Sequence, residues 1–136
     1  MKDGFTYQSL DYLIIEDEYY ARQELKAIIA QLRPEYRCVG EAEGVAEAVK
    51  FLNAHEVDLI VADISVCDGY STEVFRQTGC QTLVIITTGY EQYRDQVSHI
   101  NVVDYLLKPV APSVLEQSII KFENKHLIYS PIKQSL

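Results

Sequence analysis

Short apolar segments alternate with amphipathic segments along almost the whole chain, and this alternation limits the possible folds more than any other feature. Apolar runs typical of buried strands are found at 10–16, 37–44, 57–64, 82–88 and 102–107. Apolar residues recur at helical spacing around 21–32, 45–52, 71–77, 93–100 and 111–125. Strands that alternate with helices in this way predict an α/β fold, a parallel sheet with helices on both faces.

Only a few topologies satisfy such a pattern, because crossovers between parallel strands are right-handed. The flavodoxin-like strand order 2-1-3-4-5 is among them. In each of these topologies, ligands bind beyond the carboxyl ends of the central strands. A chain of 136 residues is expected to form one domain of this kind.

Composition excludes several classes of protein. Apolar residues make up 48% and charged residues 24% of the chain, which is typical of globular domains. The net charge of −8 argues against direct nucleic-acid binding by this segment, because such binding needs a basic face. No apolar run approaches the roughly 20 residues that span a membrane. The 3 cysteines lack CxxC spacing, and the first ten residues lack a secretory signal, so a cytoplasmic location is expected.

Polar residues follow the carboxyl ends of the predicted strands. Glu16 and Asp17 follow the first strand, and Asp63 ends the third. Thr87 and Thr88 lie at the end of the fourth strand, and Lys108 follows the fifth. Because the carboxyl ends of parallel strands meet at one edge of a sheet, we expect these side chains to converge there.

This combination of side chains fits phosphoryl transfer to a carboxylate. Asp63 would be the nucleophile, as aspartate is in other acyl-phosphate-forming proteins. Glu16 and Asp17 would hold Mg²⁺, which prefers oxygen ligands and would offset the repulsion between the crowded acids. Lys108 would contact one oxygen of the phosphoryl group, and a threonine hydroxyl, of Thr87 or Thr88, could donate a hydrogen bond to another.

Four stretches, IIEDE, VDLIVADISVCDG, VIITTG and DYLLKP, resemble the receiver domain of two-component response regulators. The resemblance covers roughly residues 10–125. The stretch ITTGYEQYRDQVSHINVVDYLLKP is similar to receivers of the LytR/AlgR subfamily, which precede a LytTR-type DNA-binding domain. The resemblance implies the CheY-like (βα)5 fold, a three-layer sandwich with strand order 2-1-3-4-5.

Carried over by position, Asp63 matches the phosphoacceptor of the family, and Lys108 matches its characteristic lysine. Glu16 and Asp17 match the acidic pair. The resemblance implies that these two acids and Asp63 bind Mg²⁺ together with the backbone carbonyl of Ser65.

The resemblance also implies a pair of switch residues. Thr88, rather than Thr87, matches the switch hydroxyl, because the family follows this residue with a small one, here Gly89. Tyr105 matches the switch aromatic residue. Pro109 follows a peptide bond that the family makes cis.

By this resemblance the chain is a signalling domain and not a turnover enzyme, assisting only its own phosphorylation and dephosphorylation. A sensor histidine kinase would donate a phosphoryl group to Asp63. Thr88 would then move inward and Tyr105 would follow. These movements would change the face formed by the fourth helix, the fifth strand and the fifth helix, through which a homodimer is expected. The implied output is transcription through a LytTR-type domain that is not in this chain.

The chain departs from the family beside the acceptor. Val66-Cys67 stands where the family usually carries Met-Pro, and loss of the proline should loosen this loop. The departure motivates an alternative function, a pseudo-receiver that binds partners without regulation by phosphorylation. A second alternative is a phosphatase-like hydrolase with Asp63 as the nucleophile. Such sites usually need a second aspartate two residues on, where this chain has Ser65.

The expected domain boundaries follow from the resemblance. Residues 1–9 would be an N-terminal extension, and 10–126 would be the receiver domain. Residues 127–136 would be a C-terminal tail or the start of a linker, since they contain Ser130-Pro131. The similarity to receivers that precede a LytTR-type domain leads us to expect that the chain is a piece of a longer regulator.

Overall fold

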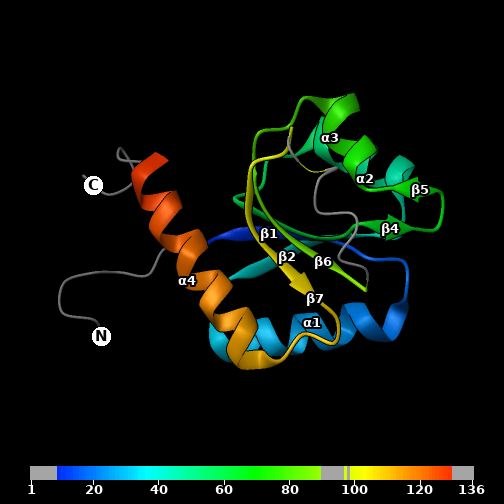
Figure 1. The fold of residues 1–136 in the computed structure, drawn as a ribbon. Helices are drawn as coiled ribbons and strands as arrows, with labels where there is room; N and C mark the ends of the chain where they lie inside the picture. The colour runs from blue at the N-terminus through cyan, green and yellow to red at the C-terminus, as the bar shows by residue number, and fades with distance from the viewer. Residues whose placement is uncertain (1–8, 90–96, 98, 130–136) are drawn as a thin grey trace.

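The structure, a computed structural model, describes residues 9–89, 97 and 99–129 (Figure 1). Its strands are β1 (Asp11–Ile15), β2 (Arg37–Ala42), β3 (Leu59–Asp63), β4 (Ser65–Val66), β5 (Gly69–Tyr70), β6 (Leu83–Thr88) and β7 (Val102–Leu107). The helices are α1 (Tyr19–Leu32), α2 (Val45–Ala54), α3 (Thr72–Thr78) and α4 (Pro112–Tyr129). A parallel sheet of 5 strands has the order β2-β1-β3-β6-β7. This order confirms the predicted 2-1-3-4-5 topology.

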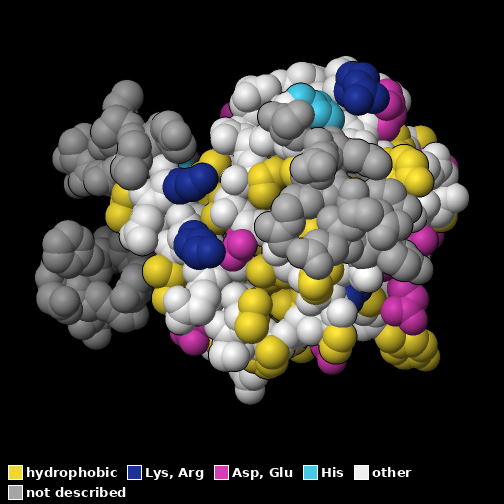
Figure 2. Space-filling view, viewed as in Figure 1, with side chains coloured by type: hydrophobic (Ala, Val, Ile, Leu, Met, Phe, Trp, Pro, Cys, Tyr) yellow, Lys and Arg dark blue, Asp and Glu magenta, His cyan; other side chains and the backbone are white. Residues whose placement is uncertain are grey.

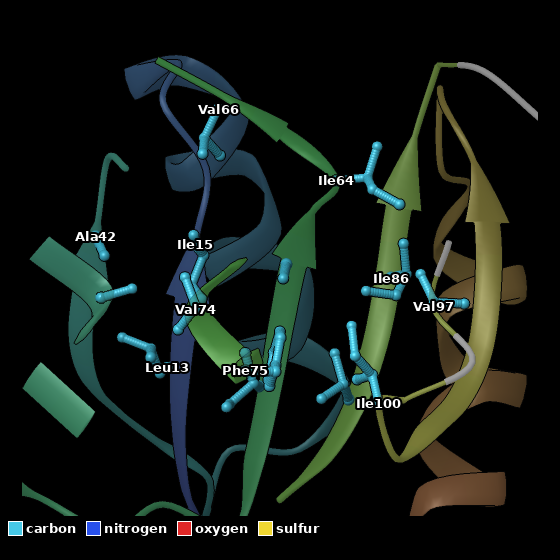
Figure 3. Close-up of a cluster of buried hydrophobic side chains, with 14 of the residues drawn as sticks. Leu13, Ile15, Ala42, Ile64, Val66, Val74, Phe75, Ile86, Val97 and Ile100 are labelled. Carbon is cyan, nitrogen blue, oxygen red and sulfur yellow. The ribbon is translucent and has the colours of Figure 1, made fainter. Parts of the chain in front are cut away.

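Helices cover both faces of the sheet, with α2 and α3 on one face and α1 and α4 on the other (Figure 1). Successive side chains of each strand point to opposite faces, so each strand supplies residues to both cores. Leu13 and Ile15 pack with Phe75 of α3 in the first core (Figure 3). Ile14, between them in sequence, packs in the second core with Phe122 of α4. The sheet is therefore buried on both faces, as the apolar runs predicted.

The predicted helix positions agree with the structure apart from two segments. The helix α1 ends at Leu32, just before Pro34, as expected of a residue that cannot continue a helix. The helix α4 runs four residues beyond the predicted end at 125, because 113–129 contains no glycine or proline to stop it. The helix expected around 93–100 falls mostly on 90–96 and 98, outside the described residues. No described helix is both long and apolar enough to cross a membrane.

The segment after Asp63 forms a hairpin where the sequence predicted a loop. Strands β4 and β5 pair in antiparallel fashion, with Ser65 opposite Tyr70 and Val66 opposite Gly69. Gly69 has a φ of 141°, a backbone conformation that side chains disfavour and glycine accepts. The hairpin supplies backbone pairing in this segment, which has no proline.

Asp68, at the turn of the hairpin, caps the helix α2. Its Oδ1 accepts a hydrogen bond from the backbone N–H of Val45 at 2.6 Å, and its Oδ2 accepts one from Ala46 at 3.2 Å. Gly44 precedes α2 and has no side chain that could cap it. A Cβ at this glycine would collide with the Asp68 carboxylate and lie 2.9 Å from Cys67 Sγ. The hairpin is thus joined to α2 by polar contacts that a side chain at position 44 would displace.

Candidate functional site

The carboxyl edge of the sheet carries a cluster of charged side chains from three strands. Glu16 follows β1, Asp63 ends β3 and Lys108 follows β7. Lys108 Nζ donates a hydrogen bond to Glu16 Oε1 at 2.6 Å and another to Asp63 Oδ2 at 2.7 Å. The fold thus brings together three residues that lie far apart in the sequence. With Asp17 they form what we call the acid–lysine cluster.

The three carboxyl groups of the cluster could share one cation. Glu16, Asp17 and Asp63 can each offer an oxygen such that all three oxygens lie within 4.8 Å of one another. Glu16 is only 2% exposed and Asp63 9%, whereas Asp17 is exposed. Such a set of hard oxygen donors, open to solvent on one side, suits Mg²⁺, which keeps several of its waters.

Backbone amides hold the second oxygen of both buried carboxylates. The N–H of Glu18 donates to Glu16 Oε2 at 3.1 Å, and the N–H of Ser65 donates to Asp63 Oδ1 at 3.3 Å. The other oxygen of each carboxylate accepts from Lys108. Both carboxylates are therefore fixed in orientation before any ligand binds.

The electrostatics of the cluster show an excess of negative charge. Although Asp17 is exposed, partial desolvation beside the cluster raises the pKa of its carboxyl group, and the hydrogen bond and negative charge of Glu16 raise it further. Burial by itself would lower the pKa of Lys108, but hydrogen bonds to Asp63 and Glu16 outweigh burial and raise it. Lys108 therefore remains a cation at neutral pH, and the carboxylates still outnumber it.

The backbone also positions the lysine. The N–H of Lys108 donates to the carbonyl oxygen of Thr88 at 2.7 Å, which ties the end of β7 to the end of β6. The Lys108-Pro109 peptide bond is cis, as the family resemblance implied.

The two proposed switch residues share one face of the sheet. Thr88 ends β6 and is 1% exposed, and it lies on the same face as Ile86, two residues earlier. Ile86 pairs in register with Tyr105, and both belong to the core that α2 and α3 cover. Thr87 points to the opposite face and pairs in register with Asp63. The strand geometry thus groups Thr88, and not Thr87, with Tyr105.

Sequence reasoning missed one residue that contacts the cluster, Arg22 of α1. Its Nη1 donates to the backbone carbonyl of Glu16 at 2.9 Å. Arg22 is buried on the same stripe of α1 as Leu25 and Ile29. Arg22, Leu25 and Ile29 have the spacing i, i+3, i+7, which places the arginine on the apolar stripe of the helix. This spacing was the signal that could have identified Arg22 as buried.

The sheet order and the polar cluster at its carboxyl edge place the chain among doubly wound α/β proteins with a ligand site at that edge. Comparison with known families makes this assignment specific. The family described as response regulator receiver domain matches residues 12–120, and the chain belongs to this family.

Individual relatives agree with this assignment. The chain is 31% identical over 129 residues to an uncharacterized response regulatory protein of Vibrio cholerae, covering 92% of this chain and 54% of that protein. It is 27% identical over 130 residues to the sensory transduction protein LytT of Bacillus anthracis, covering 93% and 52%. It is 30% identical over 112 residues to the transcriptional regulatory protein LytR of Staphylococcus aureus, covering 80% and 45%. The chain thus spans about half the length of the curated relatives it matches.

A solved structure supports the fold. The response regulatory domain of protein mrkE from Klebsiella pneumoniae superposes with a TM-score of 0.76 at 23% identity. The match covers 86% of this chain and 98% of that one. At this identity the likeness establishes the receiver fold, and the chemistry must be argued from the acid–lysine cluster.

Proposed function

We propose that the chain accepts a phosphoryl group on Asp63 from the phosphohistidine of a sensor histidine kinase. The observation that carries this proposal is the contact of the Asp63 carboxylate with Lys108, 2.7 Å away, inside a group of three convergent carboxyl groups. Glu16, Asp17 and Asp63 would hold Mg²⁺ together with the backbone carbonyl of Ser65. When bound, the cation neutralises charge on the transferring oxygens.

The residues of the chain have separate tasks in this reaction. A carboxylate oxygen of Asp63 forms a bond to phosphorus as the phosphorus–nitrogen bond of phosphohistidine breaks, and the bonding electron pair leaves with the imidazole. Lys108 is held at Asp63 as a cation and can bind an oxygen of the incoming phosphoryl group. The backbone N–H of Ser65 keeps the carboxylate from rotating. Asp63 is thus oriented before the donor arrives.

The acyl phosphate would act on the conformation through Thr88 and Tyr105. Both lie on one face of the sheet, so an inward movement of Thr88 can free space that Tyr105 then fills. The outcome is a shift in population between two conformations, driven by phosphate contacts made in only one of them.

The surface that this switch would change has apolar character. Hydrophobic side chains are visible on the face that carries β7 and α4 (Figure 2). Leu107 of β7 and Val114 of α4 are each 46% exposed, and Ile120 of α4 is 37% exposed. We propose this face as the homodimer surface. Output to transcription would pass through a LytTR-type DNA-binding domain elsewhere in the full-length protein, by analogy with the regulators named LytR and LytT.

One observation favours the alternative of a pseudo-receiver. The ammonium of Lys108 already bridges Glu16 and Asp63, so part of the negative charge is compensated without any metal ion. A pseudo-receiver would keep this bridge permanently and would use the fold only to bind a partner. It predicts that neither Mg²⁺ nor a phosphodonor changes the protein.

Incubation with acetyl phosphate, followed by intact-mass measurement, distinguishes these functions. In the presence of Mg²⁺ we expect one added phosphoryl group on the parent chain and none on Asp63→Asn. Glu18→Gln is the matched control, because Glu18 neighbours the cluster in sequence but its carboxyl group is not one of the three that converge. EDTA should abolish the modification. Equal modification of parent and Asp63→Asn, or modification of neither, would establish the pseudo-receiver instead.

A further inference from the structure

The guanidinium of Arg22 connects the loop between β1 and α1 to strand β2. Its Nη1 donates to the carbonyl oxygen of Glu16 at 2.9 Å. Its Nε donates to Glu41 Oε1 at 3.1 Å, and its Nη2 donates to Glu43 Oε2 at 3.4 Å. The residue is only 6% exposed, and its Cζ lies 5.7 Å from the centroid of the Tyr19 ring. One buried side chain thus uses three nitrogens on three separate partners.

This contact completes the anchoring of the Glu16 main chain. The N–H of Glu16 donates to the carbonyl of Ala42 at 2.9 Å, and its own carbonyl accepts from Arg22. The Glu16 carbonyl belongs to the peptide group that joins Glu16 to Asp17. Arg22 therefore fixes the orientation of that peptide, and with it the direction in which the Asp17 side chain leaves the backbone.

The charges around Arg22 keep it away from the carboxylates that would bind the cation. Glu41 and Glu43 accept its Nε and Nη2, so the guanidinium is turned toward β2. It contacts Glu16 through the backbone, while the Glu16 carboxylate accepts from Lys108 and from the N–H of Glu18. Arg22 therefore supports the loop that carries Glu16 and Asp17. Among the described residues, its hydrogen bonds involve no carboxylate oxygen of Glu16, Asp17 or Asp63.

We infer that Arg22 is a positioning residue for the divalent-cation site, holding the Glu16–Asp17 peptide so that both carboxyl groups face Asp63. This inference rests on the proposed function, in which those carboxyl groups hold Mg²⁺. Arginine suits the task because its planar guanidinium offers several donors in fixed directions. Lysine carries its three donors on a single nitrogen, so it cannot reach acceptors that are spread around the guanidinium of Arg22.

Charge and positioning predict opposite effects when Arg22 is removed. A cation close to a metal site repels Mg²⁺, so loss of its charge alone would tighten Mg²⁺ binding. Loss of the contact to the Glu16 carbonyl would instead release the loop and weaken binding. The direction of the change in affinity therefore identifies the role.

The test is a calorimetric titration with MgCl₂ at a temperature where circular dichroism shows each variant to be folded. For Arg22→Gln we expect Mg²⁺ affinity to fall about tenfold, as is usual when a residue that orients metal ligands is lost. Arg22→Lys keeps the charge, is more conservative for folding, and should show a comparable loss. Lys26→Gln is the matched control, because Lys26 also binds Glu41, at 2.8 Å, but donates to no other residue in the described hydrogen bonds. Its affinity should stay unchanged or rise.

The possible results separate this inference from the proposed function. Unchanged or tighter Mg²⁺ binding by Arg22→Gln and Arg22→Lys would overturn the positioning role and leave the proposed function intact. A parent chain that binds no Mg²⁺ would overturn both. Weaker binding by both arginine variants, with Lys26→Gln like the parent, would establish the positioning role.

Discussion

Two groups of charged side chains in this protein differ in how completely their charges are compensated. The acid–lysine cluster at the carboxyl edge of the sheet has three carboxyl groups and one ammonium. The second group fastens α4 to the rest of the fold, and we call it the α4 anchor. It consists of Arg33, Tyr36, Asp104, Ser118, Lys121 and Glu123.

In the α4 anchor each carboxylate accepts hydrogen bonds from a cationic side chain and from a hydroxyl group. Glu123 accepts from Arg33 Nε at 2.7 Å, from Arg33 Nη2 at 3.1 Å and from the Tyr36 hydroxyl at 2.5 Å. Asp104 accepts from the Ser118 hydroxyl at 2.6 Å and from Lys121 at 3.2 Å. A compensated group of this kind has no need of a ligand, and its role is structural. The excess of acids at the sheet edge instead favours a cation from outside.

The pKa values of the two groups shift in opposite directions. Burial would raise the pKa of Asp104, but hydrogen bonds from Ser118 and Lys121 outweigh it and hold the pKa below its usual value. The pKa of Asp17 is raised, because partial desolvation and the neighbouring Glu16 both disfavour its charge. The negative charge of Asp104 is thus stabilised in the α4 anchor, whereas that of Asp17 is destabilised at the sheet edge.

The largest expected effect comes from removing the one cation of the acid–lysine cluster. Lys108→Met should destabilise the protein in EDTA, because Glu16 and Asp63 lose their shared partner. It should also bind Mg²⁺ more tightly, since no ammonium competes for their oxygens. At a Mg²⁺ concentration 100 times the Kd, mass action adds about 2.7 kcal/mol to the free energy of unfolding. At that concentration Mg²⁺ should add less to the free energy of unfolding of the parent. Urea unfolding with and without MgCl₂ measures both differences.

Lys121→Met is the control for this experiment, because Lys121 belongs to the α4 anchor and contacts Asp104. Its response to Mg²⁺ should match that of the parent. If Mg²⁺ raised the free energy of unfolding equally in Lys108→Met and in the parent, Lys108 would not compete with the cation. The sheet edge would then not differ from the α4 anchor in its affinity for a cation.

The next effect tests the α4 anchor itself. Glu123→Ala leaves Arg33 and Tyr36 without the acceptor they share and should lower the free energy of unfolding by about 2 kcal/mol. Mg²⁺ affinity should not change. Glu116→Ala is the control, because Glu116 is 43% exposed and lies 3.8 Å from Arg33, so its loss should cost about 0.5 kcal/mol. Chemical denaturation that ranks the two variants in the reverse order would contradict this division of roles.

The sequence predicted the sheet edge better than the α4 anchor, for a physical reason. Glu16, Asp63 and Lys108 each stand where an apolar run ends, so strand topology alone brings them to one edge. Arg33 and Glu123 are 90 positions apart and stand at no such marked point. Their pairing depends on how α4 packs across α1, which periodicity does not specify.

Two local features depend on packing that the sequence does not specify. A loop was predicted after Asp63, but the cap that Asp68 makes on α2 depends on where the hairpin meets Val45. The spacing of Arg22 from Leu25 and Ile29 could have marked it as buried, but only the packed structure shows what it contacts.

A smaller effect concerns a buried hydroxyl beside the acceptor. Thr87 is 1% exposed, pairs in register with Asp63, and its Oγ1 has no hydrogen-bond partner among the described residues. Thr87→Val keeps the shape and removes this unpaired group, so the free energy of unfolding should rise by about 1 kcal/mol. Thr88→Val is the control. Thr88 is equally buried, but it takes part in an interaction and its hydroxyl is not among the buried polar atoms without a partner. A gain from Thr88→Val as large as that from Thr87→Val would contradict the argument.

The smallest expected effect is the pH dependence of the free energy of unfolding, which should differ between the α4 anchor and the acid–lysine cluster. The pKa of Asp104 is lower in the folded state than in the unfolded state, where it is about 3.9. Its charge therefore stabilises the fold above that value, and the contribution disappears as the pH falls through the lowered pKa. Asp104→Asn should be less stable than the parent at pH 7, by below about 1 kcal/mol, and the difference should vanish in acid.

Asp17 should show the opposite sign. Because its pKa is raised in the folded state, its charge destabilises the fold at neutral pH, and that cost is relieved as the pH falls through the raised pKa. In EDTA, Asp17→Asn should therefore be more stable than the parent at pH 7 and equal to it in acid. Urea unfolding from pH 7 to acid measures both differences in one series. If the two variants changed in the same direction, the α4 anchor and the sheet edge would not differ in charge compensation, and the excess of acids could no longer be attributed to a bound cation.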